Sequence, residues 1–328
     1  MLFIFDTFKR LLSEDCRRYS LLAALLFGTL LGLSAPAQAV VFYVYAARAD
    51  GGIDSINTAS GVATQIRAAN ANPNFTDLAF DNAGQLWGTW GGTGNSASEI
   101  MAINALTGAT GSPTNLGAPL NANASNSNAL AFSPTNIMWT GTGDTSSTSV
   151  LGPYTVNTST GAVTKIDSTN LVNNVYRGIL GSPYTSASIQ SAGDFAFQGS
   201  TLYATLKVTG TGSSGTDGTY LATVNTSTGA ATLIGQTSVG TININVDGLA
   251  FDPGGVLWAV GSTGNGNSAL YQVNTGNGAG AGALQLQFTF AAKTYVGATG
   301  VVPEPASLAL LGTGLAGLWV ARRRRRVG

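Results

Sequence analysis

The stretch Asp77-Leu-Ala-Phe-Asp-Asn-Ala-Gly-Gln-Leu-Trp87 decides the fold, because related phrases return along the chain. Each phrase has an apolar run, then a polar turn with Pro, Asn or Gly, then an apolar residue followed by an aromatic one. This pattern predicts two short strands joined by a tight turn. The other copies run over 130–139, 195–203 and 249–258.

A second phrase alternates with the first. It is an apolar run, an asparagine usually followed by threonine, a glycine, and a threonine-rich apolar run. It predicts a hairpin in which Asn and Gly can adopt positive φ. The five asparagines, separated by 47, 53, 68 and 49 residues, are Asn57, Asn104, Asn157, Asn225 and Asn274.

Together the two phrases make four antiparallel strands in about 50 residues, which is the length of a propeller blade. A β-helix is disfavoured because its coils are about half as long. At the start of the repeats, 41–45 matches a second strand and 53–66 a third and fourth. The leftover run 294–302 can supply the missing first strand and close the ring. We therefore expect an all-β propeller of about five blades, or six if the insertion at 168–190 forms strands.

The phrase Leu-Ala-Phe-Asp-x-x-Gly-x-Leu-Trp resembles the repeat of NHL-type and related propellers. The resemblance supports the fold and implies no function, because propellers serve many functions.

The N-terminus has the pattern of a signal peptide, residues 1–39. Four basic residues precede an apolar run at 21–33, and small residues follow, with Ala37 and Ala39 at the −3 and −1 positions. We expect signal peptidase to cleave after Ala39, leaving an exported segment over 40–301. An uncleaved membrane helix is the weaker alternative. Cys16 is the one cysteine and precedes the apolar run, so the mature chain would contain no thiol and no disulfide.

The C-terminal segment, 302–328, combines a proline-rich motif, an apolar run and a basic end. Pro303, Glu304 and Pro305 hold the backbone extended. The uncharged run 306–321 would form a helix of about 24 Å, slightly short of a bilayer core. Five arginines stop it on the cytoplasmic side, because each would cost at least about 2.5 kcal/mol at mid-bilayer. They are Arg322, Arg323, Arg324, Arg325 and Arg326.

This order of parts resembles the PEP-CTERM sorting tail of Gram-negative bacteria. The alternative is an ordinary tail anchor with a chance Pro-Glu-Pro. The resemblance implies transient anchoring in the inner membrane, cleavage by an exosortase near Pro303–Pro305, and transfer to the cell surface or extracellular matrix. Because this system accompanies exopolysaccharide and biofilm production, exopolysaccharide is a possible partner.

Composition excludes several classes of function. The exported segment has six basic and eleven acidic residues, a net charge of −5, so a nucleic-acid partner is not expected. The sequence contains no histidine, which removes imidazole bases and ligands. We expect no cofactor, no metal site and no catalytic residues.

One polar set could form a ligand site. Asp77, Asp194 and Asp247 each precede a Leu/Phe-Ala-Phe strand, and Asn128 lies near the same place in another unit. Around a ring they could form a shallow site for a cation or a sugar hydroxyl at one mouth of the channel. The favoured interpretation is that each caps its own turn. Likewise, Trp87, Trp139 and Trp258 could stack on sugars, but packing between blades is favoured.

The leading hypothesis is a non-enzymatic binding module of the surface or matrix. Two alternatives stay open: a protein-interaction scaffold, and a hydrolase or lyase that uses an aspartate-based site.

Overall fold

The computed structural model describes the repeat region of the chain. Its described residues are 41–69, 73–91, 98–117, 120, 127–142, 153–166, 188–209, 218–240, 242–262, 267–276 and 280–301. The chain divides into two compact units, Met1–Val40 and Val41–Gly328. The description below concerns the second unit.

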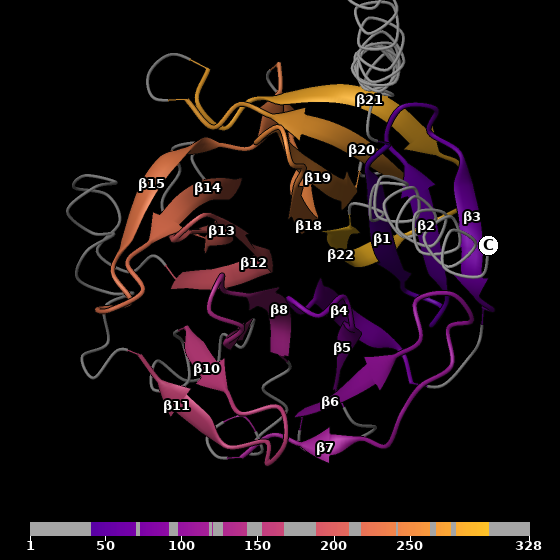
Figure 1. Ribbon diagram of the computed structural model, residues 1–328. Helices are drawn as coiled ribbons and strands as arrows, with labels where there is room; N and C mark the ends of the chain where they lie inside the picture. The colour runs from indigo at the N-terminus through magenta and orange to yellow at the C-terminus, as the bar shows by residue number, and fades with distance from the viewer. Residues whose placement is uncertain are drawn as a thin grey trace, which may run out of the picture. The chain divides into compact units, whose positions relative to one another are not determined.

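Five four-stranded antiparallel sheets surround one axis and form a five-bladed propeller (Figure 1). Each blade is given from its inner strand outward. Blade 1 is β22 (Tyr295–Val301), β1 (Tyr43–Arg48), β2 (Ile53–Asn57) and β3 (Ala63–Arg67). Blade 2 is β4 (Phe75–Phe80), β5 (Leu86–Gly91), β6 (Ser98–Ile103) and β7 (Thr114–Asn115). Blade 3 is β8 (Ser127–Phe132), β9 (Met138–Thr142), β10 (Tyr154–Val156) and β11 (Val163–Lys165).

Blade 4 is β12 (Ser188–Gln198), β13 (Thr201–Thr209), β14 (Gly218–Val224) and β15 (Ala231–Gln236). Blade 5 is β18 (Asn245–Phe251), β19 (Leu257–Ser262), β20 (Ser268–Val273) and β21 (Leu284–Phe290). A two-stranded ribbon, β16 (Ser238–Val239) and β17 (Ile242–Asn243), lies between blades 4 and 5 in the sequence. The expected all-β propeller is confirmed, and its count is five blades.

The ring closes as the sequence predicted. The last described strand, β22, pairs antiparallel with β1, with Tyr43 opposite Val301 and Ala46 opposite Ala298. In Figure 1 yellow β22 accordingly lies beside indigo β1. Pairing the last strand with the first satisfies backbone groups that would otherwise form an open sheet edge.

The asparagine hairpins work through side chains as well as through glycine. In the first of them, Asn57 Oδ1 accepts hydrogen bonds from the N–H groups of Ala59 (2.9 Å) and Ser60 (3.1 Å). Gly61 then takes a φ of 70°, a left-handed conformation that glycine adopts without a Cβ clash. The same two bonds recur at Asn104, Asn157 and Asn225. Glycine therefore supplies the positive φ, and asparagine caps the turn.

The recurring aromatic residues hold neighbouring blades together. Phe80, Phe132, Phe197 and Phe251 each pack on an aromatic ring from the second strand of the preceding blade. The centroid distances of these pairs are 5.1, 6.4, 6.0 and 5.0 Å, and the partners are Tyr45, Trp87, Trp139 and Tyr203. Such pairs contribute about 1 kcal/mol beyond their buried area. Trp258 is buried in the core between blades 5 and 1. The three tryptophans thus serve blade packing, as favoured from the sequence.

Because adjacent strands are antiparallel, their connections alternate between two faces of the ring. We call one the hairpin face. It has the turns from first to second strands and from third to fourth strands, together with the start of β1 and the end of β22. We call the other the loop face. It has the connections from second to third strands and those between blades.

Candidate functional site

Two aspartates from different blades meet on the propeller axis. Asp77 comes from β4 of blade 2 and Asp194 from β12 of blade 4, and both side chains are fully buried. Asp194 accepts two backbone hydrogen bonds, from Phe195 N–H to Oδ1 (2.5 Å) and from Leu249 N–H to Oδ2 (2.5 Å). Leu249 belongs to blade 5, so this carboxyl joins the inner strands of two neighbouring blades.

One carboxyl oxygen of Asp77 accepts no hydrogen bond from an N–H group. Its Oδ1 accepts the N–H of Leu78 at 2.8 Å, whereas the buried Oδ2 receives no hydrogen bond from a protein donor. The Asp194 carboxyl lies within hydrogen-bonding reach of Asp77. One proton held by the pair would let Asp77 donate a hydrogen bond to Asp194. Asp194 accepts an N–H hydrogen bond at each oxygen, whereas Asp77 Oδ2 accepts none. We therefore assign the neutral acid to Asp77 and the carboxylate to Asp194.

The surroundings of the two carboxyls favour the retention of one proton by the pair. Burial raises the pKa of both carboxyls well above the ordinary aspartate value, and the neighbouring Asp194 charge raises the pKa of Asp77 further. Backbone N–H groups, including that of Leu130 from the intervening blade 3, lower both pKa values but do not offset burial. Two carboxyls in contact inside a protein cannot both ionise readily near neutral pH, because their negative charges repel. The pair therefore titrates as a unit.

A backbone irregularity places the pair. Each inner strand has a shift in its pairing register at the same height, for example between Phe75 and Asp77 and between Val246 and Gly248. Such bulges re-aim side chains. By register, the positions equivalent to Asp77 and Asp194 are Ala129, Gly248 and Gly297. Their small size leaves room, since a Cβ on Gly297 would lie 2.5 Å from Asp77 Oδ1.

The four residues of the predicted ligand set occupy two different levels. Asn128 and Asp247 lie one residue earlier than the aspartate pair, at the bulges of β8 and β18. Both are half-buried, and Asp247 Oδ1 accepts a hydrogen bond from Asn245 Nδ2 at 2.8 Å. The structure thus brings Asp77 and Asp194 together and does not add Asn128 and Asp247 to the same level.

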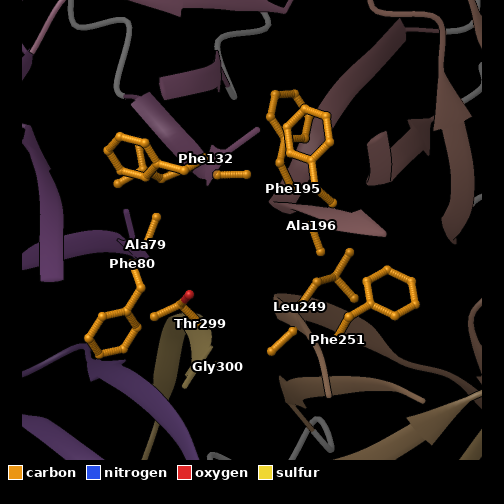
Figure 2. Close-up of a pocket in the computed structure, with 13 residues that line it drawn as sticks. Ala79, Phe80, Phe132, Phe195, Ala196, Leu249, Phe251, Thr299 and Gly300 are labelled. Atoms are coloured by element: carbon orange, nitrogen blue, oxygen red, sulfur yellow. The ribbon is translucent and has the colours of Figure 1, made fainter. Parts of the chain in front are cut away.

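A cavity of about 140 Å³ lies on the axis toward the hairpin face. Figure 2 shows its wall, which is built from the last residues of the inner strands, including Phe80, Phe132, Phe251 and Gly300. Leu130, Phe195 and Leu249 also line it, and the aspartates do not. These three residues therefore separate the acid pair from the cavity.

The chemistry open to the pair is narrow. Among the residues that the structure describes, no three His, Cys, Asp or Glu side chains gather as metal ligands. Two carboxyls surrounded by N–H donors are suited to hold one proton between them, because those donors stabilise the Asp194 carboxylate. Neither carboxyl has an exposed atom that a substrate could reach in this conformation.

A second charged group, missed from the sequence, lies in blade 1. Fully buried Asp54 on β2 accepts hydrogen bonds at Oδ2 from Lys293 Nζ (2.7 Å) and Tyr295 Oη (2.7 Å), and Arg48 lies 3.6 Å from Oδ1. Burial, then the bond to Asp54, raise the pKa of the Tyr295 phenol. We call this group the closure clasp, because it fixes β22 to β2. Nothing in the sequence pattern predicted the closure clasp, because Asp54 is a single aspartate near the start of a strand.

Several expectations concern residues outside the described part of the chain. They are the signal cleavage positions Ala37 and Ala39, the motif residues Pro303, Glu304 and Pro305, and the five arginines from Arg322 to Arg326. In the part that the structure describes, no helix is long and apolar enough to cross a membrane.

Sequence comparison identifies the tail. The family described as the PEP-CTERM protein-sorting motif matches residues 301–326. The chain therefore has the motif that implies export, a membrane-anchored C-terminal segment before processing, and sorting by an exosortase. No curated protein matches the chain significantly.

Solved structures resemble the ring only distantly. TolB from Acinetobacter baumannii is 11% identical, with 87% of this chain and 71% of that chain covered and a TM-score of 0.46. A protein of unknown function from Bacteroides caccae is 10% identical, with 80% and 100% covered and a TM-score of 0.46. The periplasmic gluconolactonase PpgL of Pseudomonas aeruginosa is 11% identical, with 76% and 83% covered and a TM-score of 0.39. At these values no function is transferred.

Proposed function

We propose that the propeller is a non-enzymatic binding module that an exosortase delivers to the surface or extracellular matrix of a Gram-negative bacterium. Its ligand would be the exopolysaccharide that the same cell secretes. The observation that carries the delivery part is the sorting motif at 301–326, which implies export and anchoring before processing.

The position of the motif suits removal of the tail. The closing strand β22 ends at Val301, and Pro303 follows two residues later. Cleavage near Pro303–Pro305 would leave β22 and the closure clasp intact. The released product would therefore keep a closed ring.

Burial of the acid pair supports a binding role over catalysis. A general acid or nucleophile must come within hydrogen-bonding reach of its substrate. Asp77 and Asp194 are fully buried, and Leu130, Phe195 and Leu249 lie between them and the axial cavity. The full sequence also contains no histidine that could act in their place.

A hydrolase or lyase is the second candidate, and one observation favours it. Carboxyls with strongly raised pKa values, in contact with each other, often mark active sites. An enzyme would require the inner strands to open. Turnover of a polysaccharide by the protein, lost in Asp77→Asn, would establish this candidate and refute a purely binding role.

Two measurements test the proposal. Mass spectrometry of the surface form should find its C-terminus near Pro303–Pro305 in cells with the exosortase, and an intact C-terminus in cells without it. A surface form that retains Arg322–Arg326 would refute the sorting role. A glycan array that includes the host's own polysaccharide tests the ligand, and binding of a surface protein but of no glycan would favour the scaffold alternative.

A further inference from the structure

Both ends of the described ring leave from one place on the hairpin face. The inner strand β22 ends there at Val301, and its partner β1 begins directly opposite, with Tyr43 paired to Val301. The five Cα-to-Cα steps from Val301 to Ala306, where the apolar run begins, span at most about 18 Å. While the tail is anchored, the hairpin face is therefore held close to the bilayer.

Exposed apolar side chains concentrate on this same face. Seven large hydrophobic residues are exposed in the part of the chain that the structure describes, and five belong to the hairpin face. Leu106, at 85% exposure, and Val62, at 60%, are the most exposed of the five. The complete set on this face is Val41, Val62, Leu106, Ile137 and Val256. They come from blades 1, 2, 3 and 5.

The hairpin face is also poor in charge. In its described turns the charged residues are Asp81 and Asp252. Each carboxylate is engaged within its own turn and by a tryptophan, with Trp87 Nε1 3.1 Å from Asp81 and Trp258 Nε1 3.1 Å from Asp252. By contrast, the loop face has the charged residues Arg48, Asp50 and Lys293.

We propose that the hairpin face rests on the lipid surface of the membrane while the sorting tail is anchored. The inference rests on the anchoring that the sorting motif implies. Separate apolar side chains dip into the headgroup region, where each gains by leaving water. Individually weak contacts suffice, because the short tether keeps the local concentration of lipid high.

The arrangement has a functional consequence. It directs the loop face outward and holds Val301 at the membrane surface, beside the segment that the exosortase must cut. Because basic residues are absent from the described turns, the contact depends on apolar burial and does not require anionic lipids.

Site-directed fluorescence tests the orientation. The anchored precursor, from cells that lack the exosortase, is reconstituted in phosphatidylcholine vesicles with Cys16→Ser in every variant. A polarity-sensitive dye is attached at Leu106→Cys or Ile137→Cys, and at Ile242→Cys on the loop face as the matched control. All three positions are exposed, so the labels do not disturb the core.

The dye at positions 106 and 137 should be quenched by a spin-labelled lipid, and shielded from aqueous iodide several-fold compared with the dye at 242. Equal iodide access at all three positions, with the protein attached to floated vesicles, would overturn this inference and leave the sorting role intact. A precursor that does not float with vesicles would overturn both.

Discussion

Replacing Asp77 by asparagine should remove a pH-dependent loss of stability. The Oδ1 atom of the new amide can keep the bond from Leu78 N–H, and its Nδ2 would replace Oδ2, the buried oxygen that accepts no hydrogen bond. The change keeps shape and hydrogen bonds but needs no proton. Asp194→Asn is the matched control. Both of its oxygens already accept N–H donors, so an amide nitrogen would face a donor there.

The size of the effect follows from proton linkage. The unfolded chain ionises both carboxyls near their ordinary pKa, whereas the folded pair keeps one proton to higher pH because burial raises its pKa. Over that window the unfolded state binds fewer protons, so the free energy of unfolding of the wild type falls by about 1.4 kcal/mol per pH unit. Below the ordinary aspartate pKa both states are protonated and the loss disappears.

Thermal unfolding from about pH 5 to about pH 8 is the assay, and each kcal/mol corresponds to about 2–4 °C in a domain of this size. The Tm of Asp77→Asn should change little with pH. It should exceed the wild-type Tm by an amount that grows as the pH rises. Asp194→Asn should lower stability at every pH by about 3 kcal/mol, the cost of a buried unpaired donor. Equal effects of the two substitutions, or a wild-type profile already flat, would refute the shared proton and its assignment.

Three further changes have defined outcomes. Ser133→Asp should raise the free energy of unfolding by about 1 kcal/mol in urea titrations. Trp139 Nε1 is buried without a hydrogen-bond partner, whereas the equivalent tryptophans donate to Asp81 and Asp252, and an aspartate at 133 would supply the missing acceptor. No gain in stability would contradict the equivalence of these turns. Asp54→Asn should lower the free energy of unfolding by about 2–3 kcal/mol in the same titration, because it weakens the charge-assisted hydrogen bonds that the buried carboxylate accepts from Lys293 and Tyr295; a loss below about 1 kcal/mol would show that the clasp does not hold β22. Gly297→Ala should destabilise the ring, because the new Cβ would lie 2.5 Å from both the Cα and Oδ1 of Asp77, and a thermal scan that matches the wild type would show that the inner strands can move apart.

The fold was predictable because its information is local and repeated. The Leu-Ala-Phe strand, the turn at Asp81 and the aromatic residue after it form a self-contained unit, and repetition gave the blade. Closure was predictable because residues 41–45 lacked an inner partner while 294–302 was left over. The strand formed over Tyr295–Val301 agrees with that expectation.

The relation among the aspartates was harder to predict, because it depends on a shift of one residue. The bulge in every inner strand separates Asn128 and Asp247 from the level of Asp77 and Asp194. Aligning the copies on Ala-Phe does reveal a shared offset for Asp77 and Asp194. That the two carboxyls would meet across the axis depends on the narrowness of a five-bladed ring and on Gly297, which only the assembled blades reveal.

Joining the ring through its final strand has a consequence for the order of events during export. The segment that completes blade 1 is among the last of the ring to emerge from the translocation channel, and the sorting signal follows it at once. A chain shortened anywhere before Tyr295 would lack both β22, the strand that closes the ring, and the sorting motif. Because anchoring and sorting are implied by the motif at 301–326, such a shortened chain would be neither anchored nor sorted.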